Sequence, residues 1–361
     1  MKVARNLFDQ MVSVENLFVS WDYFKRGKRK KKDIQYFERF LEDFIFDLHK
    51  DLVSFQYRHN TYEHFYVFDP KERYISKACV RDRLVHQMLY STLTEVFDKT
   101  FIFHSFSCRL GKGTHTGLKQ LQRSLRKVSL NGQRACFALK MDVRRFFDSV
   151  DHQILKNLIE KRVKDEKVLK LVDMVIDSFT VQKNGERSVG LPLGNVTSQL
   201  FANIYLHELD NFVKHHLRQK HYLRYCDDFV LVSHEKCSLT SVIDPIQRFL
   251  KEELLLELHP KKIILKKLHQ GIDFLGYILF LNHRLLRIRT KHRMKRRLKE
   301  NYSKYLNNEV EKSRIDQCLQ SYLGILSHSN QYELALALKN AYWVRNERKV
   351  VRTNNNRFLC C

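Results

Sequence analysis

The segment His221–Ser233, HYLRYCDDFVLVS, constrains the fold more than any other stretch of this sequence. Apolar and aromatic residues flank two adjacent acids, Asp227 and Asp228, which predicts two strands joined by a tight turn. Each carboxylate raises the free-energy cost of ionising the other. Two like charges at such a turn therefore indicate either an ordinary polar turn or a site where a cation lies between them.

A third acid ends another short apolar stretch. Asp142 lies near the end of Cys136–Val143, CFALKMDV, which is predicted to be a strand. If this strand is a sheet neighbour of the Asp227–Asp228 hairpin, the three carboxylates meet at one edge. Clustered carboxylates suit a hard divalent cation such as Mg²⁺. Two such ions, about 3.5–4 Å apart, can stabilise the attacking and leaving oxygens of a phosphoryl transfer.

The net charge predicts a polyanionic partner. Lys and Arg number 65 and Asp and Glu 40, an excess of 25. The excess is dense in Lys25–Lys32 and in Arg287–Lys299, and 25 Phe and 16 Tyr are interleaved with the basic residues. This combination is typical of a groove that binds nucleic acid strands. A solvated basic surface or binding to membrane headgroups is the alternative.

Other classes of protein are disfavoured. No window approaches the roughly 18 consecutive apolar residues of a membrane span, and the N-terminal residues lack the apolar core of a signal peptide. The eight cysteines form no C-x-x-C pair, which argues against a zinc site. We therefore expect an intracellular, cytoplasmic protein that does not bind membranes.

The pattern of elements predicts an α+β fold with an antiparallel sheet rather than a regular βαβ alternation. Residues 1–60 are expected to be mostly helical, and two strands are expected within Glu63–Ala78. Asp82 is predicted to cap the helix that follows. A strand is expected at Leu254–Leu258 and a hairpin turn at Asn282–His283, and the last ~75 residues are expected to form basic helices.

Five segments resemble, in order, the motifs of reverse transcriptases. They are RYISKACVRDRLVHQ (Arg73–Gln87), FALKMDVRRFFDSVDHQIL (Phe137–Leu155), GLPLGNVTSQLFANIYLHELD (Gly190–Asp210), YCDDF (Tyr225–Phe229) and GIDFLGYIL (Gly271–Leu279). The resemblance runs from about Phe8 to Tyr322. It implies a right-hand polymerase, with fingers and palm in residues 1–283, a helical extension at about 1–60, and a short helical thumb in residues 284–361.

The resemblance also implies roles for individual residues. Asp142, Asp227 and Asp228 would be catalytic and would hold two Mg²⁺ ions, for which Mn²⁺ can substitute, with the Val143 carbonyl as a further ligand. The nucleotide-binding residues would be Lys71 and Arg73 at the triphosphate, Phe147 under the sugar, and Leu193, Gly194, Ser198 and Gln199 in the base-pair pocket. The primer grip would be Phe274, Leu275, Gly276 and Tyr277.

One position departs from the usual family pattern. Most reverse transcriptases have Gln at the position of Leu193, and the variant found here resembles the enzymes of diversity-generating retroelements. That resemblance implies error-prone cDNA synthesis, leading to mutagenic retrohoming, because a pocket without this polar group discriminates less between nucleotides. The implied partners are a template RNA, a DNA or RNA primer, dNTPs and a small basic accessory protein.

Two alternatives stay open. The first is a reverse transcriptase of a retron, a group II intron or a phage-defence system. The second is a non-catalytic, maturase-like RNA-binding protein on the same scaffold, against which the intact acids Asp142, Asp227 and Asp228 argue.

Overall fold

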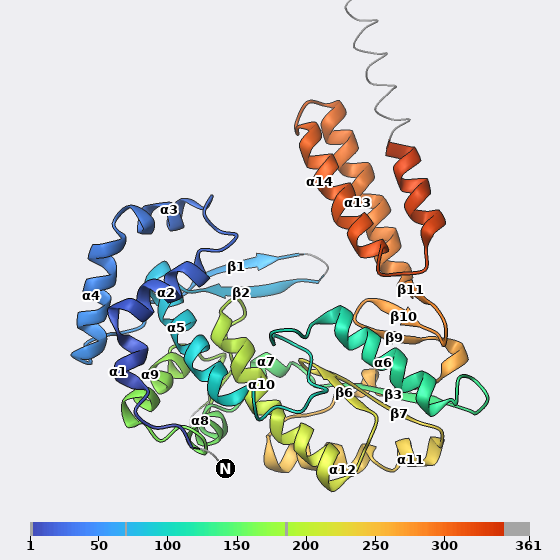
Figure 1. The fold of residues 1–361 in the computed structure, drawn as a ribbon, viewed down its shortest axis with the longest axis horizontal. Helices are drawn as coiled ribbons and strands as arrows, with labels where there is room; N and C mark the ends of the chain where they lie inside the picture. The colour runs from blue at the N-terminus through green and yellow to red at the C-terminus, as the bar shows by residue number, and fades with distance from the viewer. Residues whose placement is uncertain (1–2, 69–70, 185–186, 343–361) are drawn as a thin grey trace, which may run out of the picture. The chain divides into compact units, whose positions relative to one another are not determined.

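The computed structural model describes residues 3–68, 71–184 and 187–342. The chain forms two compact units (Figure 1). Unit 1 comprises residues 1–113, 139–231 and 237–264, and unit 2 comprises residues 114–138, 232–236 and 265–361. Because the chain passes repeatedly from one unit to the other, each unit is built from segments that are far apart in sequence. The predicted boundary at residue 283 stays a prediction about polymerase subdomains.

Unit 1 begins with a helical layer, as predicted. Its helices are α1 (Phe8–Val12), α2 (Val14–Phe24), α3 (Lys32–Arg39), α4 (Leu41–Val53) and α5 (Val80–Phe97). Helix α2 packs against α5 (Figure 1) and buries Leu17, Trp21 and Phe24. The Trp21 ring stacks on Phe37 of α3, with ring centroids 4.8 Å apart. Burial of these apolar faces stabilises the layer.

The two strands expected after this layer are present as an antiparallel hairpin, β1 (Glu63–Val67) and β2 (Arg73–Lys77). The prediction for Asp82 is wrong. Helix α5 has Cys79 at its N-cap, and Asp82 lies fully buried within the first turn. Its carboxylate accepts hydrogen bonds from the Tyr57 hydroxyl at 2.9 Å and the Asn60 backbone amide at 2.9 Å, which fixes the preceding loop, and from the Cys79 thiol at 3.1 Å.

The central sheet has the strand order β6-β7-β3-β8. Its strands are β3 (Phe137–Asp142), β6 (Tyr222–Tyr225), β7 (Asp228–Ser233) and β8 (Ile264–Lys267). Strands β6 and β7 pair antiparallel with Tyr225 opposite Asp228, so only two residues form the turn between them. The expected strand at Leu254–Leu258 is wrong. Leu255 has a φ of 52°, which interrupts an extended chain, and only an isolated bridge joins Leu258 to Val143.

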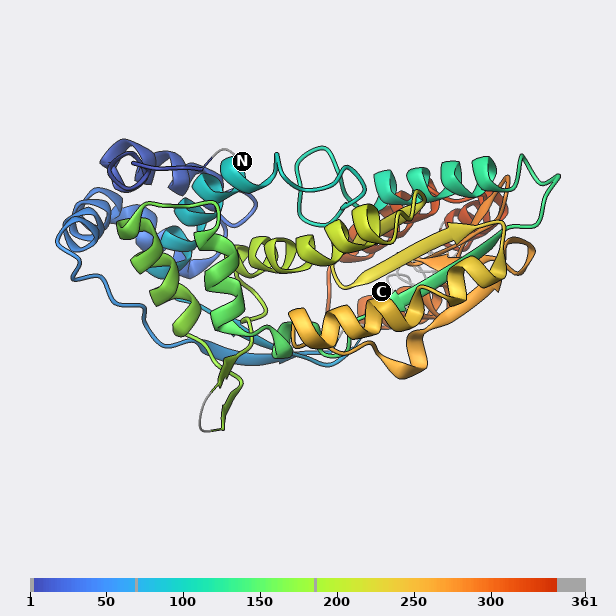
Figure 2. The ribbon, with the colours of Figure 1, turned by 90° about the horizontal axis from the view of Figure 1, so that it is seen from below.

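Further helices and one hairpin complete unit 1. They are α7 (Phe146–Ser149), α8 (His152–Glu160), α9 (Glu166–Asp177), β4 (Gln182–Asn184), β5 (Arg187–Val189), α10 (Val196–Asn211), a π-helical turn (Phe212–His216) and α12 (Ile243–Glu253). The short helix α11 (Lys236–Thr240) precedes α12. Figure 2 shows α10 as one long, nearly continuous helix. Most of its residues are buried, from Thr197 to Asp210.

The loop before α10 is tied to strand β2. The Ser76 amide donates to the Leu193 carbonyl at 2.9 Å, and the Asn195 side-chain amide donates to the Ser76 carbonyl at 3.1 Å. Between them, Gly194 has a φ of 123°, and a Cβ there would lie 3.0 Å from Cγ2 of Ile75. Both the backbone conformation and the close approach to β2 therefore require glycine.

Unit 2 contains a second, three-stranded sheet and the C-terminal helices. The elements are α6 (Thr114–Val128), β9 (Ile272–Phe274), β10 (Tyr277–Leu279), β11 (Arg284–Leu286), α13 (Ile288–Leu306) and α14 (Lys312–Leu326). The expected turn at Asn282–His283 is confirmed between β10 and β11. A second turn, which was not predicted, joins β9 and β10 into a hairpin at Leu275–Gly276. Leu275 has a φ of 47° and Gly276 a φ of 90°. Positive φ at both positions matches the two-residue hairpin turn.

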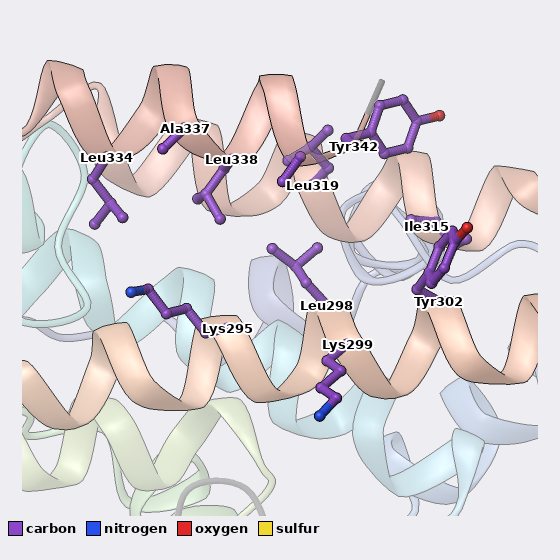
Figure 3. A pocket seen from close by; sticks show the side chains of 11 residues that line it. Lys295, Leu298, Lys299, Tyr302, Ile315, Leu319, Leu334, Ala337, Leu338 and Tyr342 are labelled. Carbon is purple, nitrogen blue, oxygen red and sulfur yellow. The ribbon is translucent and has the colours of Figure 1, made fainter. Parts of the chain in front are cut away.

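The predicted basic helices are confirmed up to residue 342, and the rest of this prediction, residues 343–361, lies outside the described residues. Figure 3 shows Leu298 of α13, Leu319 of α14 and Leu338 of a helix at residues 332–342 lining one apolar pocket between the three helices. On α13 only Met294 is buried, so most of the basic side chains of this helix lie on its surface. Among the described residues, no helix combines the length and the apolar character needed to cross a membrane.

Gly194→Ala should destabilise unit 1 by about 1–3 kcal/mol, because alanine is strained at this φ and its Cβ meets Ile75. Gly113→Ala is the matched control, since Gly113 has a φ of 110° and nothing lies within 4 Å of an added Cβ. Urea unfolding measures both. Equal losses would show that the contact with Ile75 does not matter.

Candidate active site

The structure brings the three predicted acids together within unit 1. Asp142 ends β3, Asp227 lies in the β6–β7 turn, and Asp228 begins β7, which is the sheet neighbour of β3. The Val143 amide donates to the Asp227 carbonyl at 3.3 Å, which ties the end of β3 to the turn. Two lengths of chain about 85 residues apart thus place their acids at one sheet edge, as the strand pattern predicts.

Two lysines neutralise part of this acidic cluster. Lys262 Nζ lies 2.5 Å from Asp142 Oδ1, and Lys140 Nζ lies 3.3 Å from Asp228 Oδ1. Burial, followed by repulsion from Asp228, raises the pKa of Asp227. Burial also raises the pKa of Asp228; Lys140 opposes this shift, whereas a hydrogen bond with Asp142 adds to it. Burial is therefore the largest cause of both shifts, and the lysines oppose them only in part.

The donor chemistry of this cluster fits a hard divalent cation, because carboxylate oxygens are the ligands such ions prefer. The raised pKa values of Asp227 and Asp228 also indicate that further positive charge would be favourable here. As folded, however, the described part of the chain holds no group of three Asp, Glu, His or Cys residues placed to bind a metal ion. In this structure the Lys262 and Lys140 amines lie instead against Asp142 Oδ1 and Asp228 Oδ1.

Two adjacent phenylalanines follow Asp142 in α7. Phe146 is buried, and Phe147 is half-buried, with the ring centroids 5.3 Å apart. One of the two rings, that of Phe146, therefore belongs to the core. The Phe147 carbonyl accepts from the Leu191 amide at 2.7 Å, so its backbone is tied to the start of the loop that carries Leu193 and Gly194.

The predicted pocket residues lie at the start of α10 and in the loop before it. Ser198 is buried, and its hydroxyl donates to the Pro192 carbonyl at 2.7 Å. Leu193 is half-buried, while Gly194 and Gln199 are exposed. Gly194 in the loop and Gln199 on α10 therefore face solvent, while Ser198 of α10 ties the helix to the loop.

The predicted triphosphate ligands lie on the β1–β2 hairpin. Arg73 is the first residue of β2 and is exposed, as is Lys71 in the segment before it. Arg73 and Ile75 share one face of the strand, because side chains alternate, and a Cβ added at Gly194 would lie 3.0 Å from Ile75 Cγ2. Arg73 therefore lies on the face of the β1–β2 hairpin that approaches Gly194 in the loop before α10.

Gly194 and Gln199 also line a basic pocket. Of its basic residues, only those of the run Lys25–Lys32 were singled out from the sequence. Lys28 and Lys31, from the basic run, line it together with Lys77 and Arg83. Asp33 forms ion pairs with both Lys77 (3.3 Å) and Arg83 (2.7 Å), so it offsets some of this charge.

The four predicted primer-grip residues all lie in unit 2. Phe274 and Tyr277 are buried, and the Tyr277 hydroxyl donates to the Ile325 carbonyl at 3.0 Å. Burial raises the pKa of Tyr277. Leu275 and Gly276 form the half-exposed turn. Phe274 and Tyr277 thus pack within their own unit, and the turn is the part that a ligand can reach.

Sequence reasoning missed the charged residues around the acids. The sequence could have predicted that Lys140 lies near the acids, because it precedes Asp142 by two residues in one strand and so lies on the same face. No local pattern could have predicted the position of Lys262, since the chain brings it to Asp142 through a turn that begins at Pro260. The fully buried pair Asp210 and Arg224 also had no signal, because nothing local predicts their burial.

Comparison with known proteins shows the family to which this chain is similar. The family model described as "Reverse transcriptase (RNA-dependent DNA polymerase)" matches residues 68–279, more than half of the 361-residue chain. Protein YkfC of Escherichia coli strain K12 is 24% identical over 256 residues, which cover 62% of this chain and 65% of YkfC. The group II intron-encoded protein LtrA of Lactococcus lactis is 31% identical over 134 residues, which cover 37% of this chain and 21% of LtrA.

An "Uncharacterized 91 kDa protein in cob intron" of Schizosaccharomyces pombe is 29% identical over 136 residues, which cover 37% of this chain and 16% of that protein. The matches to these curated relatives thus span from 16% to 65% of their lengths. Among solved structures, telomerase from Candida albicans is similar with a TM-score of 0.49 and 11% identity, over 81% of this chain and 61% of that one. On the family match over residues 68–279, the chain belongs to the reverse transcriptase family.

Proposed function

We propose that this protein is an RNA-directed DNA polymerase, which adds dNMP units to a primer 3′-hydroxyl along an RNA template. The observation that carries the proposal is the meeting of Asp142, Asp227 and Asp228 at one sheet edge in a chain of this family. In the reaction the 3′ oxygen forms a bond to the α-phosphorus of the dNTP, and the bond from that phosphorus to the departing pyrophosphate breaks. The primer oxygen loses its proton to solvent or a nearby base.

The protein's contribution is binding, orientation and charge. Arg73 and Lys71 bind the triphosphate, and Gly194, next to β2, leaves room for the base pair. Asp142, Asp227 and Asp228 would hold two Mg²⁺ ions, which when bound supply charge stabilisation to the attacking and leaving oxygens. Lys262 and Lys140 keep two of these carboxylates partly neutralised in the absence of metal. The basic surface of α13 suits the backbone of an RNA–DNA duplex.

The finer role that we propose is error-prone cDNA synthesis in a diversity-generating retroelement, aided by a small basic accessory protein. Leu193 supports it, because an apolar side chain replaces an amide able to hydrogen-bond near the incoming nucleotide. The second candidate is a group II intron-like reverse transcriptase. The similarity to LtrA over 134 residues favours that alternative.

Asp227→Ala should abolish primer extension on poly(rA)/oligo(dT) with Mg²⁺, because it removes one of the three clustered carboxylates. Binding of the RNA–DNA duplex should persist, since the basic surfaces are unchanged. Asp244→Ala, at an exposed aspartate of α12, is the control and should extend primers normally. A wild-type protein that binds RNA but never extends a primer would favour the non-catalytic binding protein instead.

Phe147→Ala should raise the use of ribonucleotides relative to deoxynucleotides by about tenfold or more, because a ring under the sugar would clash with a 2′-hydroxyl. Competition between rNTPs and dNTPs in primer extension measures it. Phe146→Ala is the control: this buried neighbour should lose about 3–5 kcal/mol of stability without a change in sugar selection. Unaltered selection in Phe147→Ala would exclude the steric role.

Leu193→Gln should lower the error rate opposite template adenines, where the enzymes of diversity-generating retroelements copy inaccurately, because the amide restores a polar contact near the incoming nucleotide. Sequencing of cDNA made from a defined template measures this rate. Leu193→Met, which keeps the side chain apolar, should leave errors at the wild-type level. An unchanged adenine error rate in Leu193→Gln would break the link between this residue and fidelity.

A further inference from the structure

The turn that carries Asp227 is conformationally strained. Tyr225 pairs with Asp228, so Cys226 and Asp227 alone connect β6 to β7. Cys226 has a φ of 55°, in the left-handed region that two-residue hairpin turns usually fill with glycine, asparagine or aspartate. A non-glycine residue adopts this conformation only where its surroundings hold it.

The buried side chain of Arg224 supplies part of that hold. Its Nη1 group donates to the Cys226 carbonyl at 3.0 Å and to Asn203 Oδ1 at 3.3 Å. Its Nη2 group donates to Ser105 Oγ at 3.2 Å and Asp210 Oδ2 at 2.7 Å, and Nε donates to Asp210 Oδ1 at 2.7 Å. All five N–H groups of the guanidinium therefore have acceptors, and one acceptor is the backbone of the strained turn.

Asp210 fixes the guanidinium in place. Its carboxylate accepts both Arg224 bonds and a third from the Tyr222 hydroxyl at 2.7 Å. Asp210 and Asn203 both belong to α10, the helix whose first turns carry Ser198 and Gln199. The pair thus joins the helix that begins at the nucleotide pocket to the turn of the catalytic acids, entirely within unit 1.

Stability alone does not explain this arrangement. Both side chains are fully buried, and an apolar pair of similar size in such a place is often as stable as an ion pair or more so. An apolar pair could not donate to the Cys226 carbonyl. We propose that Arg224 and Asp210 are positioning residues, which hold the Cys226–Asp227 turn and so aim the Asp227 carboxylate. This role rests on the proposed polymerase function.

Asp210→Asn tests it, because asparagine keeps the size of the side chain but removes the charge that fixes Arg224. Asp82→Asn is the matched control: Asp82 is equally buried and also accepts from a tyrosine hydroxyl, that of Tyr57. Two quantities are measured: kcat and KM for dNTP in primer extension, and Mn²⁺ binding by electron paramagnetic resonance without nucleic acid. Asp227→Ala identifies which Mn²⁺ binding belongs to the site.

Asp210→Asn should lower kcat by about a hundredfold, because small misplacements of reacting groups cost this much, with a smaller change in KM. It should also weaken Mn²⁺ binding at the site by about tenfold, whereas Asp82→Asn should lower only the thermal midpoint. If Mn²⁺ binding stays at the wild-type level in Asp210→Asn, or falls equally in Asp82→Asn, the pair has no positioning role.

If Asp210→Asn does not fold, the double variant Asp210→Asn/Arg224→Gln replaces it, because it leaves no buried charge unpaired. Arg224→Lys then serves as an intermediate variant. It keeps a positive charge beside Asp210 and should bind Mn²⁺ more tightly than the double variant but less tightly than the wild type. A wild-type protein that binds Mn²⁺ but extends no primer would contradict the proposed function. The Mn²⁺ comparison between variants would still decide on the positioning role.

Discussion

Repulsion among Asp142, Asp227 and Asp228 is the constraint on which the site depends. The sheet order places the end of β3 beside the start of β7, so the three carboxylates cannot separate without breaking strand pairing. Burial makes the repulsion more costly, as the raised pKa values of Asp227 and Asp228 indicate. Lys140 and Lys262 offset part of it. The fold thus keeps a locally unfavourable charge arrangement, which a strand pair selected for stability alone would not need.

Two hairpin turns in the chain share a feature that ordinary turns avoid. Cys226 in the β6–β7 turn and Leu275 in the β9–β10 turn both have positive φ without being glycine. In the first, Arg224 holds the Cys226 carbonyl, and in the second the Gly276 carbonyl accepts from the Arg287 amide at 3.2 Å. Strain of this kind tends to occur where a protein must hold a group in one place. The two turns carry, respectively, predicted catalytic and predicted primer-grip residues.

Local pattern was enough to predict most elements and the acidic cluster, because strand alternation and helical periodicity are short-range signals. It failed where a residue's partner is distant. Aspartate is a common N-cap residue, which is why Asp82 was predicted to cap α5. In the structure Asp82 lies within the first turn of α5, where Tyr57 and Asn60 of the preceding loop donate hydrogen bonds to it. The apolar run at Leu254–Leu258 satisfies a strand pattern, yet the backbone at Leu255 leaves the extended region.

The charged surroundings of the acids show the same limit. Lys262 reaches Asp142 across 120 positions, a pairing that no local pattern encodes. Arg224 and Asp210 are polar residues in segments that otherwise read as core, and only the fold shows that they meet. The predicted role of Leu193 in fidelity concerns a bound nucleotide, which neither a local sequence pattern nor the backbone describes.

The interleaving of the two units has a consequence for biosynthesis. Helix α6 belongs to unit 2, and its Arg126 donates to the Leu281 carbonyl, 155 positions later. Unit 1 likewise takes its last segment from residues 237–264. A nascent chain therefore cannot finish one unit before it starts the other, although domains commonly fold one at a time from the N-terminus. On the ribosome, the hydrogen bonds from Gln122 and Arg126 of α6 to the Leu281 carbonyl cannot form until the second sheet has been translated.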